Sequence, residues 1–115
     1  MILCKDEIID KRLPMVKRLL SALLRAEVFV TSNQDEAKAI VARRLGFEMP
    51  YLDALWKGSR FKVSLPQELL LAMEDQSRWL MSAGLTDRTE VPDFLDLIYL
   101  DGLKAINPEA VSTIH

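Results

Sequence analysis

The two side chains best suited to covalent or metal chemistry lie near opposite ends of the chain. Cys4 is the only cysteine, and the last residue, His115, is the only histidine. A nucleophilic thiol needs a neighbouring base, and a zinc site needs several cysteine or histidine ligands at short spacings. With one residue of each type, the sequence predicts no metal site and no internal disulfide. Because Cys4 ends an apolar run at residues 1–4, we expect its thiol to be a buried packing group.

Carboxylates are the next candidates for chemistry. Asp93, Asp96 and Asp101 are close enough in sequence to suggest a hard-cation site, but a calcium loop requires several oxygens on one sharp turn. We therefore expect these aspartates to cap short helices. Glu74 and Asp75 are adjacent, so on a helix they point about 100° apart, which is a poor geometry for paired acid–base catalysis. The sequence offers no catalytic residue, and we expect the protein not to be an enzyme.

Aromatic and basic side chains are the remaining candidates for ligand binding. Trp56 and Trp79 are able to stack on a planar ligand, but each lies on an apolar helical face and is expected in the core. Lys11, Arg18 and Arg25 are seven residues apart, which allows a phosphate-binding stripe. Without interleaved aromatic residues or glycines, a solvated face explains them better. The four glycines are scattered and form no phosphate loop. The sequence thus identifies no ligand-binding residue and no cofactor.

Length and composition indicate one folded domain over residues 1–115. The chain is 50% hydrophobic and 28% charged, which argues against disorder. A mean hydropathy of +0.07 favours some apolar surface for a partner. No run of about 18 apolar residues occurs, so we expect no membrane insertion. The start, MILCKDEIID, is too acidic for a secretory signal, so a chain expressed as it stands is expected in the cytoplasm.

Charge is distributed unevenly along the chain. Residues 1–65 contain 12 basic and 8 acidic side chains, a net charge of +4. Residues 66–115 contain 3 basic and 9 acidic side chains, a net charge of −6. The two halves should attract each other, within one chain or between subunits, and nucleic acid is not an expected partner.

The segment that organises the chain covers residues 60–85. Its first six residues alternate between polar and apolar side chains and predict a short strand. Pro66 then begins a helix that extends to about Ala83, and Gly84 ends this helix. The polar exception on the apolar face of this helix is Gln76, which is expected to meet a backbone partner. Helical spacing predicts one buried stripe, made of Leu69, Ala72, Met73, Gln76, Trp79, Leu80 and Ala83.

Similar signals place the other elements and predict a mainly α fold of about five helices with one or two short strands. Residues 1–4 are a candidate strand. A long helix is expected from Pro14 to about Thr31. A second helix is expected to follow it, with Ser32 and Asp35 as its N-terminal cap and Gly46 at its end. Shorter helical segments are expected at residues 51–56, after Pro92, at Asp101 and after Pro108.

Two blocks, FKVSLPQ followed by RWLMSAGL and VPDFLD followed by LKAINPEAV, resemble a known family. They are similar to the C-terminal portion of bacterial ABC-transporter substrate-binding proteins of the sulfonate, nitrate and taurine type. That group also includes the binders of thiamine pyrimidine precursors. The resemblance extends over residues 1–115. It implies that the chain is a fragment of a two-lobed α/β periplasmic-binding-protein fold.

The resemblance also implies a function in solute import. Family members are exported, bind a small ligand between two lobes and deliver it to a membrane permease. The chain is thereby expected to be a periplasmic solute-binding component of an ABC importer, or part of one. An ABC permease is the implied partner, and a small anionic solute, organic or containing nitrogen or sulfur, is the implied ligand. Family ligand clefts draw mainly on preceding segments, so we expect the isolated chain not to bind ligand. The alternative is a self-associating helical interaction module, such as a homodimer formed through exposed apolar surface.

Overall fold

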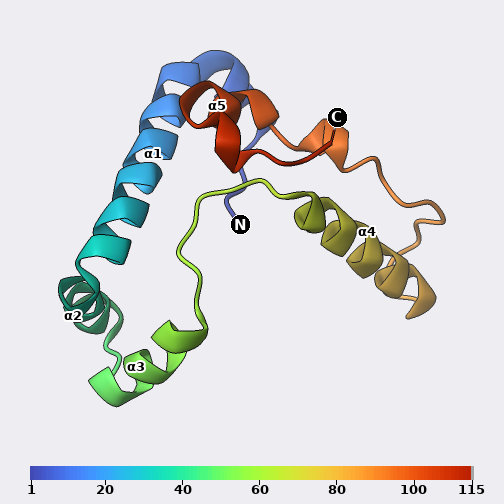
Figure 1. Ribbon diagram of the computed structural model, residues 1–115. Helices are drawn as coiled ribbons and strands as arrows, with labels where there is room; N and C mark the ends of the chain where they lie inside the picture. Colours follow the sequence, from blue (N-terminus) through green and yellow to red (C-terminus); the bar gives the residue numbers. More distant parts are fainter. Residues whose placement is uncertain (115) are drawn as a thin grey trace. The chain divides into compact units, whose positions relative to one another are not determined.

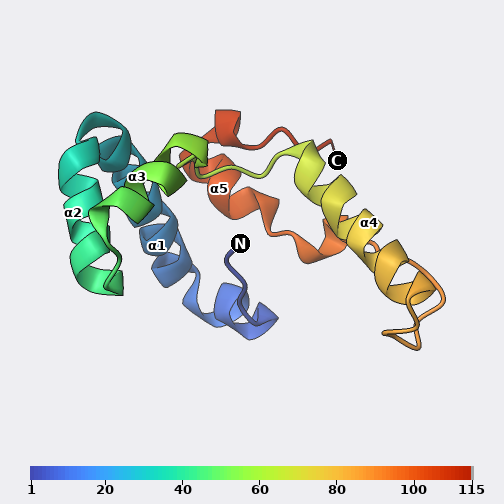
Figure 2. The same cartoon turned by 90° about the horizontal axis from the view of Figure 1, so that it is seen from below.

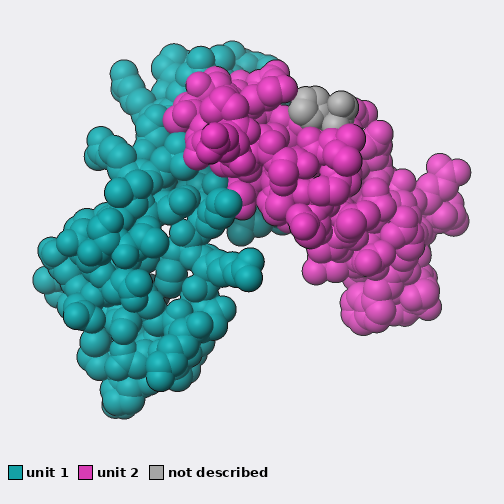
Figure 3. Space-filling model, in the orientation of Figure 1, with its two compact units in different colours: residues 1–63 teal, residues 64–115 magenta. Residues whose placement is uncertain are grey.

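The computed structural model describes residues 1–114 and shows an all-α chain of five helices without strands in that range (Figures 1 and 2). Contacts divide the chain into two compact units, Met1–Val63 and Ser64–His115, which Figure 3 distinguishes by colour. The helices are α1 (Asp6–Ser32), α2 (Gln34–Leu45), α3 (Met49–Gly58), α4 (Gln67–Ser82) and α5 (Leu100–Ile106). Two short 3-10 helices, η1 (Leu95–Leu97) and η2 (Pro108–Ala110), complete the second unit.

Helix α1 begins eight residues before the expected start at Pro14. The extra turns are possible because the helix is kinked at Arg12, where φ is −134° and ψ is 35°. A proline inside a helix removes one backbone donor and clashes with the preceding turn, so a kink close to it relieves both problems. Pro14 therefore lies just after a break in α1 rather than at its first turn.

The first unit continues through α2, which packs against both α1 and α3. The expected end of α2 at Gly46 is confirmed, because this glycine has a left-handed φ of 70° and its N–H donates to Ala42 O at 2.8 Å. The expected cap at Ser32 is wrong. Ser32 is the last residue of α1, and Asn33 alone joins the two helices without a side-chain cap on α2.

The second unit is held at the start of α4 by the end of the chain. Leu65 forms a single parallel bridge with Val111: its N–H donates to Ala110 O at 2.8 Å, and its carbonyl accepts from Ser112 N at 3.1 Å. Ile114 N also donates to Gln67 Oε1 at 2.8 Å. These bonds attach the last residues of the described chain to the first turn of α4.

The two expected strands do not form. Residues 1–5 have no regular structure, and residues 60–64 are extended but unpaired. A strand needs a ladder of hydrogen bonds with a neighbour, and the backbone of residues 60–65 is engaged differently. Val63 N donates to the Glu27 side chain, and only Leu65 reaches the single bridge. Cys4 is consequently exposed, not buried as expected.

The core of the described chain is small. The buried apolar residues are Ala37, Leu52, Leu103 and Ala110, and Leu52 is the largest side chain that is fully enclosed. Many large apolar side chains are exposed instead, including Trp79 at 61% and Leu71 at 51%. Hydrophobic stabilisation scales with apolar area removed from water, so the interior by itself provides little of it.

Helix α4 presents a different face to its unit from the one expected. The half-buried residues of α4 are Gln67, Leu69, Leu70, Met73, Glu74, Ser77 and Met81. Of the expected stripe only Leu69 and Met73 are half-buried, and Gln76 is exposed with no hydrogen-bond partner for its side chain among residues 1–114. The buried face is thus rotated by about one residue, roughly 100°. Gly84, with φ of 67°, ends the helix as expected.

Candidate functional site

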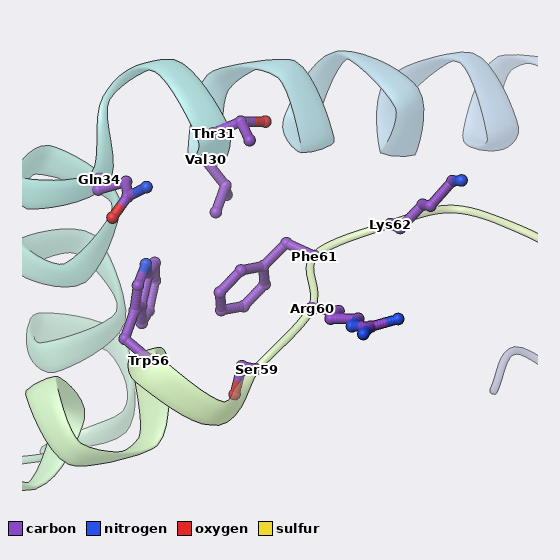
Figure 4. Close-up of a pocket in the computed structure, with 8 residues that line it drawn as sticks. All are labelled: Val30, Thr31, Gln34, Trp56, Ser59, Arg60, Phe61 and Lys62. Carbon is purple, nitrogen blue, oxygen red and sulfur yellow. The ribbon is translucent and has the colours of Figure 1, made fainter.

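A shallow aromatic pocket lies in the first unit (Figure 4). It lies between the end of α1, the start of α2, the end of α3 and the segment that follows α3, and has a volume of about 350 Å³. It is lined by Val30, Thr31, Gln34, Trp56, Ser59, Arg60, Phe61 and Lys62. A neighbouring depression of about 380 Å³ shares Gln34 and Trp56 with it.

The pocket is built around two aromatic rings. The ring centroids of Trp56 and Phe61 are 4.4 Å apart and the rings are tilted by 40°. Trp56 is half-buried, whereas Phe61 is 39% exposed. Figure 4 shows both rings pointing toward each other from opposite sides, with Val30 of α1 beside them. The expectation that Trp56 packs in an apolar cluster fits this contact, but the cluster is open to solvent.

Two hydrogen-bonded points hold the segment that carries Phe61. At its start, Ser59 N donates to Trp56 O at 3.2 Å and Ser59 Oγ donates to Leu55 O at 2.8 Å. At its end, Val63 N donates to Glu27 Oε2 at 2.6 Å in a part-buried bond. Because both ends are attached, residues 60–62 form a short wall against the end of α1.

Positive charge surrounds the two depressions. Lys38 Nζ lies 2.7 Å from Asp53 Oδ1 and 6.0 Å from the centroid of the Trp56 ring. Lys57, Arg60 and Lys62 also line these depressions, and none has an ion-pair partner among residues 1–114. Four cations thus face one carboxylate, a balance that favours anions.

The chemistry that this arrangement favours is weak binding of a small anion. In Figure 4 the side chains of Arg60 and Lys62 extend away from the Trp56–Phe61 pair, so the charges lie at the rim. A small anion with an apolar or planar part would place that part on the rings and its charge near the rim. Among the described residues, no cysteine, histidine or carboxylate lines the pocket around Phe61; its hydroxyl and amine groups belong to Thr31, Ser59 and Lys62.

The other candidates from the sequence do not join this site. Trp79, expected in the core, lies on α4 in the second unit and is 61% exposed. Glu74 and Asp75 both contact one cation, with Arg78 nitrogens at 3.1 and 2.8 Å. These three residues lie together as an ion-paired cluster on α4.

Asp93, Asp96 and Asp101, considered from the sequence as a cation site, form no metal-binding group in the described part of the chain. Asp93 Oδ1 accepts a hydrogen bond from Leu95 N at 3.0 Å, a local turn contact that fits the expected structural role. Asp101 lies inside the first turn of α5 and makes no side-chain cap there. The prediction that Asp101 caps a helix is therefore wrong. In the described part of the chain no three or more His, Cys, Asp or Glu side chains form a group able to hold a metal ion. His115 lies outside that part.

Sequence reasoning missed Glu27 and Phe61. Glu27 is a lone carboxylate on the apolar side of α1, four residues after Leu23 and three before Val30. A charged residue on an otherwise apolar face is seldom buried without a partner, and this was the available signal. Phe61 was assigned to a strand, and its contact with Trp56 depends on a turn of the chain after α3 that the sequence pattern does not specify.

One further finding concerns the membrane: no helix in residues 1–114 combines the length and the apolar character that a bilayer crossing requires. Comparison of the chain with protein-family models, with curated proteins and with solved structures finds no match.

Proposed function

We propose that this chain is a helical part of the solute-binding component of an ABC importer. The solute is a small anion, organic or containing nitrogen or sulfur, and the protein works outside the cytoplasmic membrane with an ABC permease. In this proposal the chain corresponds to the C-terminal part of a two-lobed α/β binding protein, and it does not bind the solute alone. The family in this proposal rests on the resemblance of two sequence blocks, FKVSLPQ with RWLMSAGL and VPDFLD with LKAINPEAV.

The observation that carries the proposal is the small core. Among residues 1–114 four apolar residues are buried, whereas large apolar side chains are exposed on every helix from α1 to α4. Monomers rarely leave so much apolar surface uncovered. A chain whose helices cover the rest of a larger protein has this property, because the missing contacts are made by that protein.

The Trp56 pocket adds a secondary argument about the ligand. Its surplus of Lys and Arg suits an anion, in agreement with the implied solute class. Its rings are open to solvent and its charges lie at the rim, so water competes for both. We therefore expect the isolated chain to show no measurable affinity.

Calorimetry tests this expectation directly. The purified chain is titrated with taurine, a longer alkanesulfonate, nitrate and a pyrimidine. We expect no saturable heat from any of them. Saturable heat would contradict the statement that the chain does not bind alone, and loss of that heat in a Trp56→Ala variant would place the binding at this pocket.

The positive test uses the encoding DNA. The proposal expects codons for the remaining lobe in the same or a neighbouring reading frame, beside genes for a permease and an ATPase. The protein expressed with that lobe should bind one of the four solutes with saturable heat. An isolated locus without such genes would contradict the importer function.

A second candidate function is a self-associating helical module without a small-molecule ligand. It is favoured by one specific observation, the exposed apolar face of α4 that includes Trp79 and Leu80. Sedimentation at several concentrations tests it, and a dimer or larger species is expected. A compact monomer at every concentration would exclude this candidate.

A further inference from the structure

The two compact units are joined where Val63 meets Ser64. The chain passes from one unit to the other only there, because each unit is one continuous segment. Hydrogen bonds on either side of this point attach the neighbouring residues to different units. How far each attachment reaches decides which backbone torsions are left between the units.

The first unit holds the chain up to the N–H of Val63. That N–H donates to Glu27 Oε2 at 2.6 Å in a part-buried bond, and Glu27 belongs to α1. Earlier in the same segment, Ser59 Oγ donates to Leu55 O at 2.8 Å. Residues 59–63 thus begin and end on the first unit.

The second unit holds the chain from Leu65 onward. The Leu65 N–H donates to Ala110 O at 2.8 Å, and its carbonyl accepts from Ser112 N at 3.1 Å and from Thr113 Oγ1 at 2.8 Å. Thr113 is 5% exposed, so this last bond is shielded from water. Pro66 follows directly; its ring restricts its own φ and confines the residue before it to extended conformations. Both backbone polar groups of Leu65 are therefore held by the second unit.

Ser64 lies between these two attachments without one of its own. Within residues 1–114 neither its backbone groups nor its hydroxyl has a hydrogen-bond partner. Peptide bonds are planar, so each residue contributes only the two torsions φ and ψ. With the Val63 N–H fixed on one side and the Leu65 N–H fixed on the other, the φ and ψ of Val63 and Ser64 remain between the units.

We propose that Val63 and Ser64 form a hinge about which the two units turn as separate rigid bodies. Hinges in proteins are a few loop residues that absorb large changes in φ and ψ while the elements beside them keep their contacts. The hydrogen bonds at Glu27 and at Leu65 provide such fixed contacts on either side. A partner that contacts both units is then able to change their relative orientation without breaking either attachment. The hinge goes beyond both candidate functions and does not depend on which of them is correct.

Distances between spin labels, measured by pulsed electron paramagnetic resonance, test the hinge. In a Cys4→Ser background, labels at Arg43→Cys and Gln76→Cys report on the two units together, and both native side chains are exposed. Labels at Lys17→Cys with Arg43→Cys, and at Gln76→Cys with Glu109→Cys, each report within one unit. An excess of unlabelled protein removes signals between copies.

The widths of these distance distributions decide the proposal. The distribution between units should be at least about twice as wide as either distribution within a unit, because only the pair between units spans the hinge. A distribution between units as narrow as those within a unit would overturn the proposal.

Two glycine substitutions locate the hinge. Ser64→Gly removes the Cβ and widens the accessible range of φ and ψ at the proposed pivot, so the distribution between units should broaden. Lys62→Gly is the matched control, because Lys62 lies between Ser59 and Val63, which are both attached to the first unit. It should leave the width between units unchanged. Equal broadening by both variants, or no broadening by Ser64→Gly, would contradict a hinge at this position.

Removal of the attachment on the first unit provides an independent test. Glu27→Ala releases the Val63 N–H, and the free segment then extends back towards Ser59. The distribution between units should broaden, while the two distributions within a unit keep their widths and show that both units are still folded. An unchanged distribution between units would contradict Val63 as the first residue of the hinge.

Discussion

At the scale of single residues, Glu27 makes the most consequential contact of the first unit. Its carboxylate accepts the Val63 N–H at 2.6 Å and so attaches the segment that carries Phe61. Glu27→Ala should destabilise the protein by about 1–2 kcal/mol, because a hydrogen bond to a charged group is lost and a part-buried N–H is left without a partner. Urea unfolding followed by circular dichroism measures this loss. Glu27→Gln keeps an acceptor oxygen and should cost less; an equal loss in both variants would argue against the hydrogen bond as the cause.

Leu52 is the residue on which the small core depends most. It is 2% exposed, and Leu55 on the same helix is 43% exposed. Leu52→Ala should lower the free energy of unfolding by about 3 kcal/mol, since it removes buried methyl groups and leaves a cavity. Leu55→Ala is the matched control and should cost under about 1 kcal/mol. Similar losses from both, measured by urea unfolding, would show that Leu52 is not enclosed in solution.

At the scale of elements, local signals predicted most helix ends well. Gly46, Gly84 and Pro66 are each expected at a boundary, and α2 and α4 end or begin within two residues of them. These boundaries depend on backbone conformations of neighbouring residues, so a short stretch contains the information. Ser32 failed as a cap because α1 continues through it, and the length of α1 depends on a kink that no local rule required.

Gly46 provides the prediction at this scale. Its φ of +70° is costly for any residue with a Cβ, although nothing lies within 4 Å of where that atom would be. Gly46→Ala should therefore destabilise the first unit by about 1 kcal/mol through backbone strain alone. Gly58→Ala, in the same unit with equally open space but without a positive φ, should be neutral or slightly stabilising. The thermal unfolding midpoints of the two variants, each compared with that of the original protein, measure the difference. Equal shifts in both variants would contradict backbone strain at Gly46 as the cause.

At the scale of the whole molecule, the dominant feature is apolar surface without cover. The basic residues 1–63 and the acidic residues 64–115 coincide with the two compact units, so the expected charge division has a structural counterpart. Both proposals for function draw on the exposed helix faces. They differ in what covers those faces, the rest of a binding protein or a second copy.

The fluorescence of Trp79 measures whether the exposed face of α4 becomes buried. In a Trp56→Phe variant Trp79 is the only tryptophan, and at low concentration its emission should be that of a solvated indole because the side chain is 61% exposed. If copies associate through the exposed face of α4 that includes Trp79 and Leu80, raising the protein concentration should shift the emission to shorter wavelength. A Trp79→Phe variant, in which only Trp56 emits, is the control and should not shift with concentration. An unchanged Trp79 spectrum would contradict association through this face of α4.

The sequence by itself determined the helical content, the glycine and proline boundaries and the division of charge, since all three depend on residue type and near neighbours. Only the tertiary structure decided which face of α4 is buried and that Leu65 pairs with Val111, 46 positions further along the chain. It also decided that residues 1–4 and 60–65 form no sheet, and that Phe61 lies against Trp56. Burial and pairing require a partner, and a partner distant in sequence leaves no mark in the local pattern.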